Sequence, residues 1–330
     1  MIDFRYHLVS LISVFVALAI GIVLGAGPLK EPIGDSLESQ VESLRADRDE
    51  LRTELDQSKT DLNDLNEFIV ATAPDLLGDT LTDVPVTLVR TAGTNADAVN
   101  AVRDRLSETG AGVHDGGELS AEVFDPEGAD KLLTTLRSID TDLPDDDAKA
   151  LSEALASAIS TGSSDAADEP SPEPTEGESA APDAGAAQGY DQKQSEEVLQ
   201  AFAAAGRING GGYAEAAVIV LIAPPVPEAQ AAAGEPAEAT APEPSAYSDF
   251  AASLDARTPT VVAGTTAGAE SGLVGFVRES DPGVSSVDSI ELGAGPVITA
   301  LTVGALHNDE VEGHFGFAAN ADDLMPGAEK

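Results

Sequence analysis

The stretch LESQVESLRADRDELRTELDQSKTDLNDLNEFI, residues 37–69, carries the most specific structural pattern in the sequence. Ten positions, spaced alternately by four and three residues, form a regular repeat there, and eight of the ten are apolar. They are Leu37, Val41, Leu44, Arg48, Leu51, Leu55, Ser58, Leu62, Leu65 and Ile69. A repeat of about 3.5 residues keeps one helix face towards a partner only if the helices supercoil. The stretch therefore predicts a left-handed coiled coil.

Charges beside this seam favour two parallel copies of the chain. With Leu37 as a d position, each g residue faces the e residue five places later on the partner. Asp47 then faces Arg52, Glu54 faces Lys59, and no like charges meet. Exposed ion pairs contribute only tenths of a kcal/mol, so they select orientation more than they add stability. We expect a parallel homodimer; the alternatives are a helix packed on its own domain and a coiled coil with another protein.

An uncharged segment, LVSLISVFVALAIGIVLGAGPL at residues 8–29, precedes the repeat. At about 1.5 Å per residue it reaches about 33 Å, enough to cross a bilayer core of roughly 30 Å. A cleaved signal peptide has a shorter apolar region of about 7–15 residues, so the segment predicts an uncleaved membrane anchor. Small residues four apart, Gly21 and Gly25 among them, would let two anchors approach closely. Ordinary membrane-span composition is the alternative explanation for them.

Basic residues lie before the anchor and acidic residues dominate after it. Arg5 and His7 precede the span, while Glu31, Asp35 and Glu38 follow it. The positive-inside rule then places the N-terminus in the cytoplasm and the rest of the chain outside. We expect a single-pass protein of the cytoplasmic membrane.

The remainder of the chain predicts an exported α/β domain. Residues 1–29 form the anchor, 30–72 the coiled coil and 73–330 the domain, with Ala73-Pro74 expected to end the long helix. Apolar runs predict strands that alternate with amphipathic helices, which indicates a largely parallel, Rossmann-like sheet covered on both faces. The expected strands are 85–90, 216–222 and 259–263, with further short strands near 112–114 and within 284–292. The expected helices are 98–109, 130–139, 146–159, 195–205, 248–256 and 295–307.

Two segments of the domain differ from the rest in composition. Residues 161–194 and 224–246 are rich in Pro, Glu, Ser, Gly and Ala and contain few large aliphatic side chains. Such segments bury too little apolar surface to offset their conformational entropy. They predict disordered acidic insertions in the domain.

The composition limits the chemistry that the chain can perform. Asp+Glu number 59 against 17 Lys+Arg, a net charge of -42, so a nucleic-acid partner is not expected. Cysteine is absent, which excludes disulfides, thiolate metal sites and cysteine nucleophiles. No catalytic motif is recognisable, and we expect a protein that is not an enzyme.

Two histidines bracket a short acidic stretch near the C-terminus. His307 and His314 enclose NDEVEG, residues 308–313. Imidazole and carboxylate groups are ligands for Cu(II), Ni(II) or Zn(II), which makes the pair a candidate metal site. A solvated loop without metal explains the same residues, and no other cofactor is expected.

Both ends of the chain resemble a known family. MIDFRYHLVSLISVFVALAIGIVLGAGPL at residues 1–29 and SSVDSIELGAGPVITALTVGALHNDEVEGHFGF at residues 285–317 resemble the ends of the actinobacterial copper-transport family MctB. The family name implies an outer-membrane channel that limits copper accumulation, and copper as a possible ligand. A corynebacterial member, SteB, implies instead an envelope protein that acts with a membrane partner, SteA, and a peptidoglycan hydrolase in cell separation.

The residues allow these two implications to be weighed. A membrane β-barrel needs many strands of about 9–11 residues with alternating apolar and polar positions. This sequence offers one helical span, a coiled coil and an α/β domain. Our leading hypothesis is a dimeric, membrane-anchored scaffold or regulator of the SteB type, with SteA-like or hydrolase partners. The alternative is copper transport or homeostasis, with an outer-membrane location by family name.

Overall fold

The computed structural model describes residues 4–26, 31–160, 189–226, 244–280 and 283–327. The chain divides into two compact units, Met1–Leu65 and Asn66–Lys330. Most of the two predicted insertions, at 161–188 and 227–243, lies outside the described residues.

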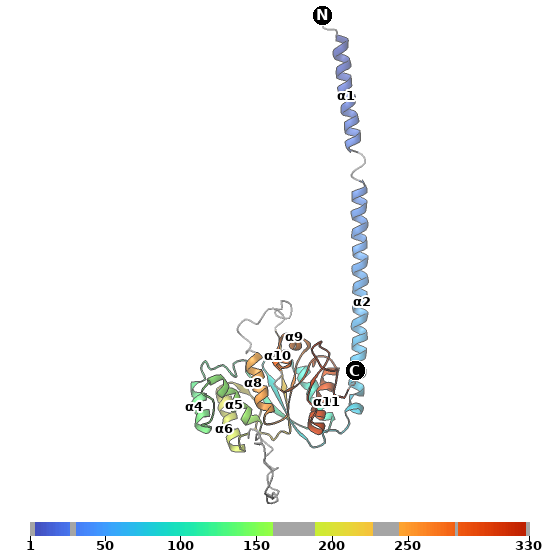
Figure 1. Cartoon of the computed structure of the whole chain (residues 1–330). Helices are drawn as coiled ribbons and strands as arrows, with labels where there is room; N and C mark the ends of the chain where they lie inside the picture. Colours follow the sequence, from blue (N-terminus) through green and yellow to red (C-terminus); the bar gives the residue numbers. More distant parts are fainter. Residues whose placement is uncertain (1–3, 27–30, 161–188, 227–243, 281–282, 328–330) are drawn as a thin grey trace, which may run out of the picture. The chain divides into compact units, whose positions relative to one another are not determined.

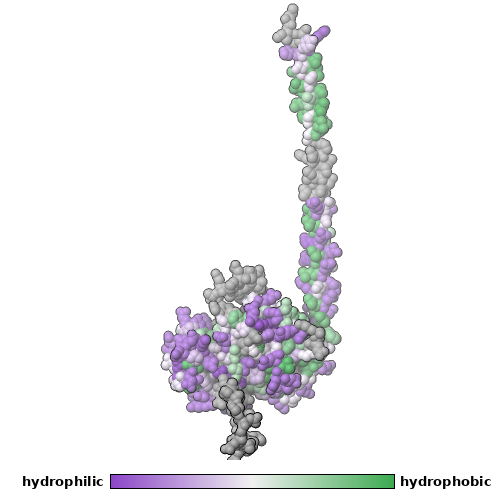
Figure 2. Space-filling model, viewed as in Figure 1, coloured by the Kyte–Doolittle hydropathy of each residue, from purple (hydrophilic) through white to green (hydrophobic). Residues whose placement is uncertain are grey.

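The first unit contains helix α1, Phe4–Ala26, and most of helix α2, Glu31–Leu77. Over Arg5–Gly25, α1 is long and apolar enough to cross a membrane. Figure 2 shows its hydrophobic surface, whereas α2 is mainly hydrophilic with apolar patches. Helix α1 therefore has the length and composition that the predicted membrane anchor requires.

Helix α2 continues past the point at which the sequence predicted its end. Ala73-Pro74 was expected to stop the helix, but α2 runs to Leu77 with Pro74 inside it. Proline has no N–H to offer the carbonyl four residues earlier. Arg105 Nη1 donates to that carbonyl, the oxygen of Val70, at 3.2 Å. The arginine thus replaces the missing donor, and burial of Ala73 and Leu77 in the core stabilises the last turns.

The second unit is built on a seven-stranded sheet in the order β3-β2-β1-β4-β5-β6-β7. Neighbouring strands are parallel except β2 and β3, so the prediction of a largely parallel sheet is confirmed. The strands are β1 Pro85–Thr91, β2 Gly112–Leu119, β3 Ile208–Asn209, β4 Val218–Ile222, β5 Thr260–Ala263, β6 Ser285–Val287 and β7 His314–Phe315.

Helices cover both faces of this sheet, giving three layers (Figure 1). One face carries the end of α2 with α3, Ala96–Glu108, and α11, Ala294–Asp309. Side chains alternate along the strands, so Leu88 and Val220 enter this core while Val89 and Leu221 enter the opposite one. The opposite face carries α4 Asp130–Ile139, α5 Asp147–Ile159, α6 Gln192–Ala204, α8 Pro244–Asp255, α9 Thr266–Ser271 and α10 Leu273–Ser280.

Two helices begin inside the stretches that composition marked as insertions. Helix α6 starts at Gln192 because Asp191 forms a capping box with Gln194: the Gln194 N–H donates to Asp191 Oδ1 at 2.8 Å, and Gln194 Oε1 accepts from Asp191 N at 3.3 Å. Helix α8 starts at Pro244. The ordered domain is therefore larger than the composition alone indicated.

Candidate functional site

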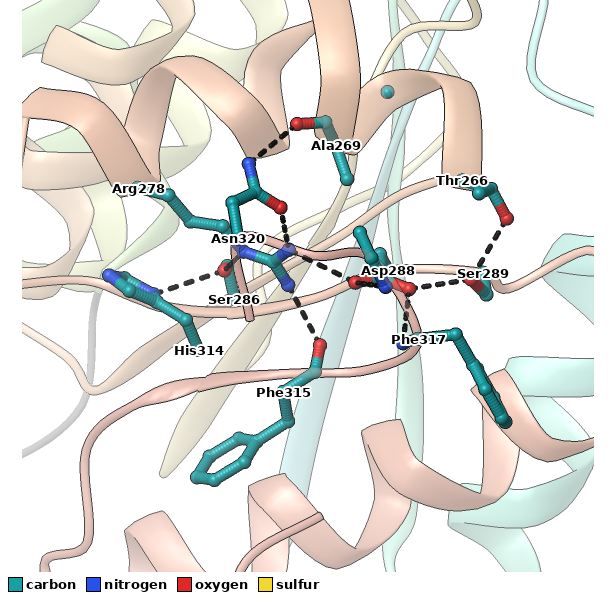
Figure 3. Close-up of polar contacts among 12 residues, drawn as sticks. Thr266, Ala269, Arg278, Ser286, Asp288, Ser289, His314, Phe315, Phe317 and Asn320 are labelled. Carbon is teal, nitrogen blue, oxygen red and sulfur yellow. Dashed lines mark hydrogen bonds and ion pairs between the residues drawn. The ribbon is translucent and has the colours of Figure 1, made fainter. Parts of the chain in front are cut away.

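A buried polar cluster lies where α10, β6 and the chain after β7 meet (Figure 3). Its centre is an ion pair between Arg278 of α10 and Asp288, the residue after β6, with Nη1 and Oδ2 3.0 Å apart. The exposed fractions of the two side chains are 2% and 0%. Asp288 belongs to the C-terminal segment that carries the family resemblance, so this cluster is the candidate site.

Asp288 accepts four hydrogen bonds or ionic contacts in this cluster. Besides Arg278, the Ser289 hydroxyl donates to Oδ1 at 2.5 Å. The backbone N–H groups of Phe317 and Ala318 donate to Oδ1 and Oδ2 at 2.8 and 3.2 Å. The carboxylate therefore fastens the chain after β7 to the end of β6.

Arg278 donates in three further directions. Its Nε reaches Ser286 Oγ at 3.0 Å, and its Nη1 reaches Asn320 Oδ1 at 2.8 Å. Its Nη2 reaches the backbone oxygen of Phe315 at 2.8 Å. Burial lowers the pKa of the Arg278 guanidinium, while the bond to Asp288 and its charge act in the opposite direction. The two side chains are thus almost fully buried, and each is the other's charge partner.

The backbone around Asp288 is arranged to admit these contacts. Gly316 has φ 132, and a Cβ on it would overlap the Asp288 carboxylate. Ser289 adopts a left-handed φ of 63 while fully buried. Its hydroxyl also lies 2.9 Å from Thr266 Oγ1 at the start of α9. These contacts connect the chain after β7 to α9, α10 and the end of β6.

The two predicted histidines occupy different elements. His307 is exposed in the last turn of α11, whereas His314 begins β7 and its Nδ1 lies 3.1 Å from Ser286 Oγ. His314 also lines an open cavity of about 420 Å³ with Glu312 and Asp322. Within the described ranges, no group of three or more His, Cys, Asp or Glu side chains is arranged to hold a metal ion. The metal site stays a prediction.

The carboxyl ends of β1 and β4 form the switch point at which such sheets often bind ligands. Here Pro225 occupies part of that position, 3.4 Å from where a Cβ on Gly93 would lie. Asn95 caps α3 by accepting from the N–H of Asp97 at 2.8 Å. A separate groove of about 380 Å³ lies between α3 and the turn before α11, with Val70 and Leu292 among its lining residues.

The predicted seam residues lie on a largely exposed face of α2. Exposed apolar side chains there are Val41, Leu44, Leu51, Leu55, Leu62 and Leu65, while the side chain of Leu37 is not among those described. Arg48 pairs with its neighbour Asp49 at 2.6 Å on the surface. Ile69 is half-buried against the core that α3 and α11 form. In the anchor, Gly21 and Gly25 have open space around them.

Sequence reasoning did not single out the ion pair. Acidic residues number 59 with Asp and Glu combined, so one aspartate after a short strand carries no signal of its own. The one available signal was that Asp288 lies in the segment 285–317 that resembles a known family. Arg278 lies outside that segment, so no sequence signal pointed to it.

Comparison with known families agrees with the resemblance at both ends of the chain. A family model described as "Copper transport outer membrane protein, MctB" matches residues 1–326. The chain belongs to the MctB family.

Curated relatives of the MctB family are found in mycobacteria. Proteins named "Copper transporter MctB" from Mycobacterium tuberculosis and Mycobacterium bovis are 28% identical to this chain over 138 residues. The protein of that name from Mycobacterium leprae is 37% identical over 138 residues. These matches span 42% of this chain and only 44% of the relatives' length. The names favour the copper hypothesis over the cell-separation hypothesis.

Proposed function

We propose that this protein is a membrane-anchored envelope protein that acts in copper transport or homeostasis. The observation that carries the proposal is the family match over residues 1–326, with relatives named as copper transporters. The proposal gives the protein no enzymatic activity. It replaces the cell-separation scaffold as the leading hypothesis, since the names of the relatives point to copper.

The protein would work as a parallel homodimer, with its N-terminus in the cytoplasm and the α/β unit exported. Support for the dimer comes from the exposed apolar face of α2, where Leu44 and Leu51 have exposed fractions of 67% and 64%. The pairing of Glu54 with Lys59 of a second copy would favour the parallel orientation. Support for the anchor comes from the length and composition of α1.

A copper-accumulation assay tests the proposed role. Cells that lack the gene should contain more copper after growth in a copper-supplemented medium and should stop growing at a lower copper concentration. The full-length gene should restore both values, and a Leu51→Asp variant, which places a charge in the seam, should not. If cells that lack the gene have an unchanged copper content and fail to separate, the copper proposal would be contradicted and the cell-separation hypothesis would be supported.

Metal binding needs its own measurement because a copper role does not require a resident site. The detergent-solubilised full chain would be titrated with Cu(II) by calorimetry, beside His307→Ala and His314→Ala variants. Stoichiometric binding that either substitution abolishes would support these two histidines as ligands. Binding that both substitutions leave unchanged would remove them from the proposal.

Orientation is checked with protease. In inside-out vesicles the α/β unit should be protected, and it should be cleaved in spheroplasts. Cleavage in the inside-out vesicles would contradict the proposed topology.

A further inference from the structure

Phe68 and Leu76 are two of the exposed large apolar side chains in the last turns of α2, beside a buried face of the helix. Phe68 and Leu76 have exposed fractions of 65% and 57%. Their close neighbours Ala73 and Leu77 are 1% and 0% exposed, because they pack into the core under α3 and α11. One face of the helix therefore packs on its own domain, while Phe68 and Leu76 stay exposed on a second face, on which Ile69 and Thr72 are half-buried.

This second face continues the heptad register of the seam. Counting on from Leu65 and Ile69 by three and four gives Thr72 and Leu76 as the next d and a positions. The predicted seam ends at Ile69, and the helix was expected to stop at Ala73-Pro74. The structure carries α2 to Leu77, so the register extends by a further heptad.

The seam face and the buried face are separate sides of the helix. At 3.6 residues per turn, their centres lie about 90° apart. Asn66, Ala73 and Leu77 form the buried side, and Asn66 Oδ1 accepts from the Gly293 N–H at 3.2 Å. Ile69 falls between the two sides, which agrees with its being only half-buried. A partner helix can therefore reach the seam side while the domain keeps the other.

The arrangement of Pro74 also leaves the seam side open. In this register Pro74 is an f position, on the side of the helix that faces away from a coiled-coil partner. The carbonyl that its ring leaves unbonded is satisfied by Arg105, as described above. Neither the ring nor the displaced hydrogen bond intrudes on Thr72 and Leu76.

We propose that the dimer interface extends to Leu76, so that a second copy of this chain covers Phe68 and Leu76 and the two α/β units take part in the interface. The proposal rests on the parallel dimer proposed above and extends it. The occupant is a second copy because the exposed face continues the same register as the Asp47–Arg52 and Glu54–Lys59 pairings, which match when two identical helices lie parallel and in register.

Phe68 has a specific place in such a dimer. As a g residue it points towards the flank of the partner helix that bears position 73, where the partner's own domain packs. On each copy, that flank adjoins the groove lined by Val70 and Leu292, whose exposed fractions are 44% and 39%. The geometry points to Phe68 of one copy covering this apolar rim on the other copy.

Single-cysteine crosslinking tests the extent of the interface, because the chain has no natural cysteine. Leu51→Cys, Leu76→Cys and a control, Ala71→Cys, would be oxidised with diamide in membranes that contain the full chain. Ala71 is exposed but sits at a c position, away from a partner. We expect rapid disulfide formation between chains at positions 51 and 76, at least ten-fold faster than at position 71.

The outcomes separate the two proposals. Crosslinking at position 51 with a rate at position 76 no higher than the control would leave the dimer standing and overturn its extension to the domain. No crosslinking at either position would overturn the dimer itself.

A second measurement uses the detergent-solubilised full chain without cysteines. Phe68→Asp should raise the dimer dissociation constant at least ten-fold in analytical ultracentrifugation, whereas Val311→Asp, at another exposed apolar residue, should leave it unchanged. Circular dichroism would show that both variants keep their helix content. Equal dissociation constants for the two variants would contradict the place assigned to Phe68.

Discussion

Asp288 and Arg278 show how a single buried pair can hold the end of a chain. The two charged groups are fully withdrawn from solvent, and breaking such a pair leaves an uncompensated charge in the core. Asp288→Asn should therefore lower the free energy of unfolding by about 3–5 kcal/mol, as should Arg278→Met. Urea unfolding of the solubilised full chain, followed by circular dichroism, measures the change.

The double variant distinguishes the loss of the pair from a general loss of packing. Arg278→Met combined with Asp288→Asn removes both charges, so the double variant should be less destabilised than the sum of these two single variants. Glu270→Gln, at an exposed residue of α9, is the control and should change stability by less than about 0.5 kcal/mol. Additive costs in the double variant would show that the pair contributes no coupling.

Asp255 gives a prediction about pH. Burial raises the pKa of this carboxyl to about 6, the charge of Glu312 adds to the effect, and a hydrogen bond from the Thr260 N–H opposes it. Because the folded-state pKa lies above the unfolded value of about 3.9, the protonated form favours folding. This contribution is full below about pH 4 and is lost as the pH rises through 6.

The variant Asp255→Asn isolates this titration because its side-chain oxygen can still accept from Thr260. At pH 7.5 the variant should be more stable than the wild type by about 1–3 kcal/mol, and the difference should shrink towards zero near pH 4. Denaturation series at both pH values provide the comparison. A constant difference across the range would mean that Asp255 ionises with an ordinary pKa.

Residues of this kind were out of reach of sequence reasoning. Asp255 and Asp288 differ from the other acidic residues only in what surrounds them, and their surroundings come from Glu312 and Phe317, some 57 and 29 positions further along. The histidines, which residue type alone singled out, lie on α11 and β7 without forming a described metal cluster. Residue type marks candidates, whereas burial decides which of them are unusual.

At the level of elements, the end of α2 allows a test of how a helix passes a proline. Arg105→Met removes the donor to the Val70 carbonyl and should cost about 1–2 kcal/mol in the free energy of unfolding. In a Pro74→Ala background the same substitution should cost less, because the backbone N–H restored at position 74 can donate to Val70 itself. Arg105 also pairs with Glu108, so that lost contact should appear in both backgrounds. Equal costs in the two backgrounds would mean that the arginine does not compensate for the proline.

Elements with a continuous apolar run or a regular helical face were predictable from the sequence. Strands β4 and β5 and helix α4 lie close to their expected positions because their own residues create the pattern. Strands β3 and β7 have only two residues each, and their pairing with neighbours defines them. Residues 264–268 were expected to be a turn that enters a helix, but the bounds of α9 and α10 were not predicted, since the glycines at 268, 272 and 275 interrupt the helical pattern.

For the whole molecule, the acidic excess predicts a response to salt. With a net charge of -42, like charges repel one another across the folded surface. Raising NaCl from 20 to 300 mM shortens the screening length to below about 10 Å and should raise the Tm by several degrees. Differential scanning calorimetry of the full chain would show it, and KCl should give an equal rise if screening is the cause. A Tm that falls with added salt would contradict this expectation.

Family membership and α/β class were accessible from the sequence, whereas strand order and function were not. The two ends of the chain carried the MctB resemblance, which the family match confirms. Strand order depends on contacts between residues far apart, such as Val86 with Val218, which no local pattern records. No residue in the sequence distinguishes a role in copper transport from a role in cell separation. The names of the relatives favour the copper role, which the sequence alone had not favoured.

The bonds around Asp288 have a consequence for biosynthesis. Arg278 and Asp288 leave the ribosome before Phe315 and Phe317, whose backbone groups complete their contacts. A nascent chain that ends between these points carries two charges that no later residue has yet enclosed. We expect the α/β unit to finish folding only when its final residues emerge. If the unit is exported as proposed, the growing chain would therefore enter a translocation channel before the unit has folded. Fusing a translation-arrest sequence after residue 310 or after residue 326 would show at which length the unit becomes resistant to protease.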